Sequence, residues 1–238
     1  NKKYYIPNNA VLVIAGDIDI AKTKQLVEAY FGAVPAGAPV VQPQIKDVPI
    51  TKEVIDTAYD NNIQVPAIMA AYRIPGMTNK ESKALEMASA VLSQGNSSRM
   101  FKKMVDYKKN SLQVGSFNYA LEDYGAYITY ALPNAETPLD TLLKDIDDEV
   151  VKLQNQLISV EEFTKIQNQF ENAFVDNNNR MLGVAENLAA GYTFYKNTNN
   201  LNTELDEIRK VTRQDIMNAA KKYLNKNQRV VLYYLPKK

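Results

Sequence analysis

The sequence predicts an α+β protein in which helices pack on one face of a mostly antiparallel sheet. Two observations support this fold class. Beyond residue 53, strand-like and helix-like segments follow in the order β-β-α-α-β-β-α-α-α-α-α-β, so the helices are grouped rather than alternating singly with strands. The hydrophobic fraction of 45% is also sufficient for a buried core.

A strand and a helix are expected first. The continuous apolar run Ala10–Ala15 predicts a strand that is buried on both faces. Asp19 is placed to cap a helix over 20–31, whose apolar side chains recur at helical spacing. No second strand follows this helix, so residues 1–35 form only half of a βαβ-like unit.

A linker is predicted next. Four of the 10 prolines fall between residues 35 and 49, and no helical or strand period survives among them. Prolines at this spacing favour an extended, semi-rigid chain. The sequence therefore divides into a segment over 1–35, a linker over 36–52 and a domain over 53–238.

The domain's elements follow from strand alternation and from helix caps. We expect two strands first, over 54–59 and 63–74, around a turn at 60–62. A helix between the capping box 78–81 and Gly95, a short helix over 97–107 and an antiparallel strand pair over 112–119 and 124–132 follow. The rest of the chain is expected to form helices over 137–157, 159–181, 185–195, 201–210 and 216–224, and a final strand over 229–235.

The composition excludes several kinds of chemistry. The chain has no histidine and no cysteine. It therefore offers no imidazole for acid–base catalysis near neutral pH, no thiolate nucleophile, and no nitrogen or sulfur ligand for zinc. Carboxylates could hold calcium or magnesium, but no aspartate-rich calcium loop is present. We expect no metal site and no catalytic residue in this chain.

The charge balance argues against nucleic acid and membrane partners. Lys+Arg 28 against Asp+Glu 27 gives a net charge of +1, and the basic runs are short. Such a chain has no overall field that attracts a phosphate backbone. No apolar stretch approaches the roughly 20 residues that span a bilayer.

Five stretches, in order, resemble segments of the M16 peptidases, the zinc enzymes related to pitrilysin, insulin-degrading enzyme and the mitochondrial processing peptidase. Each is weak alone, but together they are spread over nearly the whole chain in the same order as in the family. The five stretches are Tyr4–Asp19, Tyr30–Pro35, Leu92–Phe101, Ile158–Phe163 and Val211–Ile216. The first contains a Pro-Asn-Asn and a Gly-Asp sequence, the third a Ser-Ser-Arg turn, and the fourth a pair of glutamates.

The resemblance implies the fold and the context of the chain. It implies a domain of the M16 or LuxS/MPP-like metallohydrolase type, with residues 1–35 as the last strand and helix of a preceding domain. The family's zinc motif, H-x-x-E-H, lies in that first domain. Zinc is therefore expected in the first domain or in a partner subunit, and no cofactor is expected in this chain.

The resemblance also implies partners. The chain would close a chamber together with a first M16 domain of the same polypeptide or a homologous subunit, and the chamber would take unfolded peptides. A bacterial cell envelope or periplasmic location is compatible with the family. An alternative is a structural or adaptor member that uses the fold for subunit association without proteolysis.

Two candidate substrate-binding residues come from the resemblance. Active members have an arginine and a tyrosine seven residues apart that bind the substrate backbone. A gapless alignment places Asp106 and Gln113 at these positions. Aspartate cannot donate the paired hydrogen bonds of a guanidinium, and glutamine lacks the phenol. The usual support for catalysis is therefore absent at these positions.

Arg99 and the tyrosines have two interpretations each. Arg99 follows Ser97-Ser98 and could contact a substrate strand, or it could stabilise the start of its own helix. The tyrosines that recur at Tyr124, Tyr127 and Tyr130 could pack the sheet or form an exposed face for peptide capture. The sequence leaves these alternatives open.

We predict that the purified chain binds no zinc and cleaves no peptide, because it has neither histidine nor cysteine. Elemental analysis after dialysis against zinc should find substoichiometric metal, and a quenched fluorescent peptide should remain intact. Stoichiometric zinc, or chelator-sensitive cleavage by the pure chain, would contradict this prediction.

Overall fold

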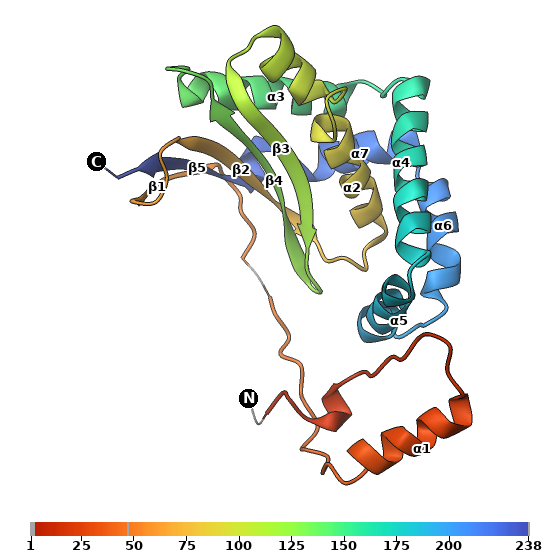
Figure 1. Ribbon diagram of the computed structural model, residues 1–238. Coiled ribbons are helices and arrows are strands. Elements are labelled where there is room, and N and C mark those ends of the chain that lie inside the picture. The colour runs from red at the N-terminus through yellow and green to blue at the C-terminus, as the bar shows by residue number, and fades with distance from the viewer. Residues whose placement is uncertain (1–2, 47, 238) are drawn as a thin grey trace. The chain divides into compact units, whose positions relative to one another are not determined.

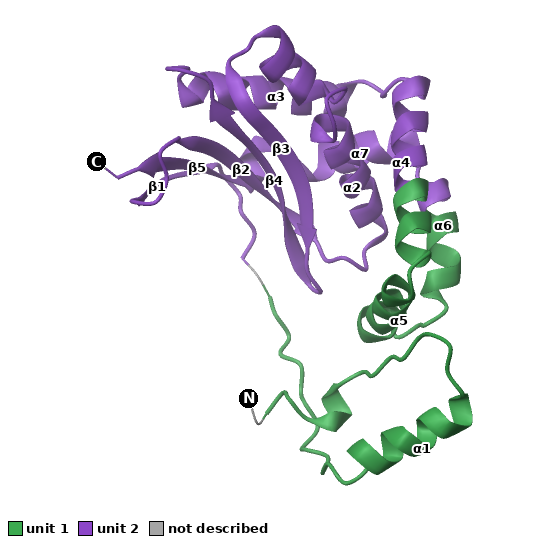
Figure 2. Ribbon diagram, viewed as in Figure 1, with its two compact units in different colours: residues 1–46, 171–207 green, residues 47–170, 208–238 purple. Residues whose placement is uncertain are grey.

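The computed structural model describes residues 3–46 and 48–237, and the chain divides into two compact units (Figure 2). The first unit comprises residues 1–46 and 171–207, and the second comprises 47–170 and 208–238. The division falls within two helices, α4 (Val160–Asn178) and α6 (Asn200–Lys210). Within the described part of the chain, none of the helices is long and apolar enough to cross a membrane.

The second unit is built on a five-stranded sheet with the order β1-β5-β2-β4-β3. β1 runs parallel to β5, whereas the other three neighbouring pairs are antiparallel. The strands are β1 (Val54–Asp60), β2 (Ala67–Pro75), β3 (Ser111–Ala120), β4 (Tyr124–Pro133) and β5 (Arg229–Pro236).

Three helices of this unit pack against one face of the sheet (Figure 1): α2 (Lys80–Ser93), α3 (Leu139–Asn155) and α7 (Arg213–Tyr223). The predicted α+β fold with helices on one face of a mostly antiparallel sheet is therefore confirmed. The short helix predicted over 97–107 is also present, but its main part is a π-helix, η2 (Phe101–Tyr107). A 3-10 turn, η3 (Lys226–Gln228), precedes β5.

The hydrophobic core lies between these helices and the sheet. Side chains alternate across a strand, and on β2 it is Ile68, Ala70, Tyr72 and Ile74 that are fully buried toward the helices. Tyr72 meets the buried Tyr127 of β4 edge-to-face, with ring centroids 6.4 Å apart. Burial raises the pKa of Tyr72 to about 12, although the nearby Arg229 opposes this shift.

A buried ionic cluster ties the last strand to the rest of the core. Arg229, the first residue of β5, is 1% exposed and pairs with Asp147 of α3. It also donates hydrogen bonds to the hydroxyl of Tyr72 at 3.0 Å and to Glu53 at 2.9 Å. Lys226 adds a second ion pair to Asp147 at 2.7 Å. Three segments that are distant in sequence therefore meet at one guanidinium.

Helix caps follow the sequence closely, with one shift. Asn79 rather than Thr78 caps α2, and its side chain accepts a hydrogen bond from the backbone N–H of Glu81. Gly95 follows the end of α2 with φ at +75°, a conformation that favours glycine. α7 begins with a full capping box between Thr212 and Asp215.

The two strands expected over 54–59 and 63–74 are present as β1 and β2, but they do not form a hairpin. The turn itself forms, since Asp60 accepts a hydrogen bond from the backbone N–H of Asn62. The two strands are nevertheless not neighbours, because β5 lies between them and pairs with both. A turn signal is local, whereas the run of apolar residues in β5 is suited to an interior position that only the tertiary structure reveals.

The first unit contains η1 (Pro7–Asn9), α1 (Ile20–Phe31), α5 (Met181–Tyr195) and parts of α4 and α6. The predicted helix over 20–31 and its Asp19 cap are confirmed, since Asp19 accepts a hydrogen bond from the backbone N–H of Lys22. The prediction of a strand over Ala10–Ala15 is wrong, because these residues belong to neither a strand nor a helix. A strand needs a neighbour for its backbone groups, and the apolar composition of this run cannot supply one.

We predict that Asp147→Ala destabilises the protein by about 3–5 kcal/mol, because it leaves the buried guanidinium of Arg229 without its main counter-charge. Asp148→Ala is the matched control. Asp148 lies next in the helix, and its ion pairs with Lys103 and Lys144 are partly exposed, so its loss should cost less than about 1 kcal/mol. Equal shifts in the urea denaturation midpoints of the two variants would show that Asp147 is not the main counter-charge of Arg229.

Candidate functional site

The face of the sheet opposite the helices is apolar and partly exposed. Since Ile68 and Ala70 point toward the helices, the intervening Met69 points to the other side. Cross-strand pairing places further half-buried apolar side chains beside it: Ala71, Ile128, Tyr130, Val230 and Leu232. We call this surface the open face.

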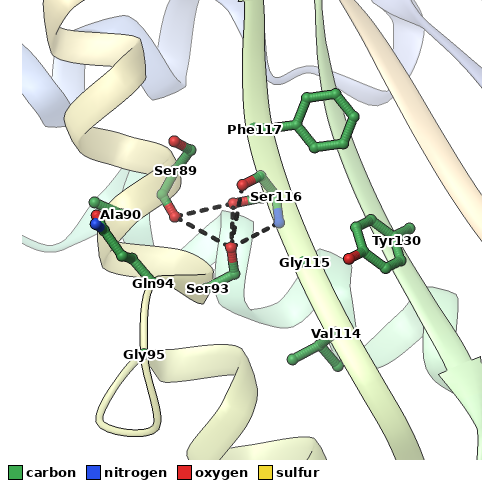
Figure 3. Close-up of a pocket in the computed structure, with 10 residues that line it drawn as sticks. All are labelled: Ser89, Ala90, Ser93, Gln94, Gly95, Val114, Gly115, Ser116, Phe117 and Tyr130. Carbon is green, nitrogen blue, oxygen red and sulfur yellow. Dashed lines mark hydrogen bonds between the residues drawn. The ribbon is translucent and has the colours of Figure 1, made fainter.

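A cavity of about 430 Å³ opens where the end of α2 meets the edge strand β3 (Figure 3). Its walls come from three elements. The end of α2 and the residues that follow it contribute Ser89, Ala90, Ser93, Gln94 and Gly95. β3 contributes Val114–Phe117, and β4 contributes Tyr130.

A network of hydroxyl groups forms one wall of this cavity (Figure 3). The backbone N–H of Ser116 donates to Ser93 Oγ at 2.7 Å. The Ser93 hydroxyl also lies 3.1 Å from the carbonyl oxygen of Ser116 and 3.1 Å from its Oγ. Ser116 Oγ in turn donates to the carbonyl oxygen of Ser89 at 3.0 Å. The side chain of Ser93 therefore holds the backbone of β3 against the end of α2.

The opposite wall depends on a glycine. A Cβ atom built on Gly115 would lie 2.2 Å from Cε1 of the Tyr130 ring, so the ring lies directly over this residue. Gln113 Nε2 donates a hydrogen bond to the Tyr130 hydroxyl at 2.9 Å. Gln113 thus orients the aromatic wall of the cavity, although it does not line the cavity itself.

Arg99 forms a structural ion pair. Its guanidinium meets the Glu162 carboxylate through two hydrogen bonds, from Nε at 3.0 Å and from Nη2 at 2.7 Å. Both side chains are largely buried, at 19% and 20% exposure. This paired geometry joins the start of the helical segment at 99 to α4, and it uses two of the five N–H donors of the guanidinium.

Asp106 lies on η2, and its side chain is exposed. The π-helix is fixed to α3 by Lys103 and by Lys108, whose ammonium group lies 2.5 Å from Asp145 Oδ1. Burial acts to raise the pKa of Asp145, but hydrogen bonds from Lys108 and Asn110 and the charge of Lys103 outweigh it, so the net pKa is lowered. η2 also packs against β3, the strand that carries Gln113. Neither Asp106 nor Arg99 lines the cavity.

The described residues do not fit a zinc ion. The whole chain lacks histidine and cysteine. Across residues 3–46 and 48–237, acidic side chains do not gather into a group of three or more that could hold a metal. Zinc prefers nitrogen and sulfur ligands in tetrahedral sites, so we assign no step of any reaction to a metal in this chain.

The residues that build the cavity were not singled out from the sequence as a site. Ser93, Gly115 and Ser116 belong to weak local patterns, and only the tertiary structure brings α2 beside β3. One signal was readable: the segment from Ser111 to Leu121 has no charged residue and no proline. Of the tyrosines considered, Tyr127 is a core residue, whereas Tyr130 is half-buried at the cavity.

Grouped helices on one face of a mixed five-stranded sheet define an α+β domain. The family model for the "Peptidase M16 inactive domain" matches residues 2–170. The chain therefore belongs to the M16 peptidase family, and the match is to its inactive domain.

Similar proteins agree with this assignment. The chain is 23% identical over 235 residues to the zinc protease PqqE of Helicobacter pylori, covering 98% of this chain and 53% of that protein. A crystal structure of a protease from H. pylori matches with a TM-score of 0.90 and 22% identity, over 98% of this chain and 57% of that one. The M16 inactive domain from Pseudomonas fluorescens matches with a TM-score of 0.77 and 15% identity, over 94% and 52% of the two chains. The chain thus spans about half the length of these relatives.

Proposed function

We propose that this chain is the non-catalytic second domain of an M16-like zinc metallopeptidase, which closes the chamber of the enzyme and binds extended peptide. In this proposal residues 1–35 are the tail of the preceding domain, 36–52 are a linker, and 53–238 are the second domain. Zinc would be bound by the first domain or by a homologous partner subunit, where the histidine motif belongs.

The observation that carries the proposal is the open face of the sheet. It presents half-buried apolar side chains from three central strands, including Met69, Ile128 and Leu232. A monomeric protein rarely leaves a contiguous apolar surface without a role in binding. An unfolded peptide supplies both apolar side chains and free backbone groups, which suit such a surface and its edge strand.

A second candidate is a structural or adaptor member of the family that never cleaves. The occupants of the two substrate-binding positions favour it. Asp106 has no donor for a peptide carbonyl, and Gln113 uses its amide to bind Tyr130. The presence of an H-x-x-E-H motif in the first domain or in a partner subunit separates the two candidates, since only the peptidase needs it.

Met69→Lys in the complete protein tests the binding role. Its side chain is half-buried in the middle of the open face, and a lysine stem can occupy the same space while its charge remains at the surface. A peptide that covered this face would have to desolvate the charge, so we expect affinity for a labelled unfolded peptide to fall about tenfold or more.

Val151→Lys is the matched control for this experiment, because Val151 is 47% exposed on α3 in the helix layer. Fluorescence anisotropy measures both dissociation constants, and thermal melting verifies that both variants fold. Equal affinities for the two variants, or no peptide binding by the wild-type protein, would rule out peptide capture by the open face.

A paired substitution tests the two candidate positions. Asp106→Arg combined with Gln113→Tyr should strengthen peptide binding by the complete protein by about 1–3 kcal/mol, as expected for new hydrogen bonds to a charged group. Asp123→Arg, at the exposed β3–β4 turn, makes the same change in charge and should have little effect. Isothermal titration with an unfolded peptide distinguishes them. Unchanged or weaker binding by the double variant means that these residues are not the substrate pair.

A further inference from the structure

The start of the linker is held against the N-terminal 3-10 turn by one side chain. Asn8 lies in η1, and its amide bonds both backbone groups of Gly37, which lies 29 residues further along the chain. The N–H of Gly37 donates to Asn8 Oδ1 at 2.9 Å, and Asn8 Nδ2 donates to the carbonyl oxygen of Gly37 at 3.2 Å. The pair therefore uses both the acceptor oxygen and the donor nitrogen of the asparagine amide. We call it the Asn8–Gly37 clamp.

The clamp depends on a glycine in the linker. A Cβ atom built on Gly37 would lie 2.8 Å from Cδ1 and 2.8 Å from Cγ2 of Ile6, the residue before η1. Non-bonded carbon atoms pack at about 3.5–4.0 Å, so a larger residue would push the linker away from the turn. Gly37 is also half-buried, whereas Ala36 and Ala38 on either side of it are exposed. The contact between the turn and the linker is therefore centred on this one residue.

The two asparagines of the Pro-Asn-Asn sequence have different roles. Pro7 is the first residue of the turn, and its ring fixes the backbone there. Asn9 Nδ2 donates to the carbonyl oxygen of Tyr4 at 2.9 Å, which closes the turn on itself. The amide of Asn8 instead reaches outside the turn to the linker. The turn thus has its own support, and Asn8 serves the linker.

Beyond the clamp the linker runs without regular structure. Before it, α1 ends at Phe31, and the N–H of Val34 bonds the carbonyl oxygen of Phe31. After it, residues 38–46 form neither a helix nor a strand, and all of their side chains except that of Val40 are exposed. If the clamp opened, residues 35–37 would join this extended chain. An extended residue spans at most about 3.3–3.6 Å, so the linker would gain up to about 10 Å of reach.

We propose that the Asn8–Gly37 clamp is the anchored end of the linker, and that it limits how far the second domain can move from the preceding domain. This inference rests on the proposed function, in which residues 1–35 belong to the preceding domain and the two domains enclose a chamber. A peptide enters such a chamber when the domains separate, so the length of the free linker sets the widest opening. Residues after Gly37 then act as the hinge, and those before it move with the preceding domain.

A purely structural role of Asn8 would give a different result. If Asn8 only stabilised the N-terminal segment, its loss would lower the melting temperature and leave the spread of domain positions unchanged. The two hydrogen bonds of its amide go to the linker, so the clamp predicts the reverse: a wider spread of positions at a nearly unchanged melting temperature. A lower melting temperature without a wider spread overturns the proposal.

Asn8→Ala in the complete protein tests the clamp. This chain has no native cysteine, so spin labels can be attached through Lys24→Cys on α1 and Val151→Cys on α3, two exposed positions. We expect the distance distribution from double electron–electron resonance to broaden, with its long end extended by up to about 10 Å. Asn9→Ala is the matched control, because it removes the same kind of amide but only the bond to Tyr4 within the turn. Its distribution should match that of the wild-type protein.

Gly37→Ala breaks the clamp from the side of the linker and leaves the turn unchanged. Its added Cβ collides with Ile6, so we expect the same broadening, and combination with Asn8→Ala should broaden the distribution no further. Unchanged distributions in both single variants overturn the clamp, and so does an equal broadening in Asn9→Ala. These results leave the peptide-binding test of the proposed function untouched. If the distributions broaden as expected but the wild-type protein binds no peptide, the clamp stands and the chamber role fails.

Discussion

The architecture of the second unit depends on the insertion of β5 between β1 and β2, which Arg229 secures. This residue bonds Glu53, a partner 176 positions earlier in the sequence, as well as Asp147 on α3. A buried guanidinium is costly unless every partner is in place, so the cluster permits one position for the final strand. Because α3 contributes one of those partners, the helices are held on the same side of the sheet as Arg229, and the other side remains open. Because the last element, β5, is an interior strand, the chain must form its longest-range contacts to complete the sheet, which is typical of slowly folding topologies.

Much of the fold could be predicted because its signals are local. The helix 20–31 was correct to the residue, and the order of elements beyond residue 53 matches the structure. The strand expected over 10–15 was wrong because the apolar run was interpreted by itself, whereas strand formation depends on partners elsewhere in the chain. The turn at 60–62 was correct, but a local turn does not determine which strands become neighbours. β5 lies between β1 and β2, and no property of residues 54–74 predicts that another strand separates these two.

The candidate site was less predictable than the fold. Arg99 illustrates the reason: its partner Glu162 lies 63 positions away, and only that ion pair shows that the guanidinium is already engaged. Gln113 was selected by its position in an alignment, and the structure gives it a different contact, the Tyr130 hydroxyl. The cavity arises where the end of α2 meets β3, and each of its serines and its glycine is unremarkable alone. Sequence reasoning could find the uncharged character of β3, but it could not show that the strand lies at an edge.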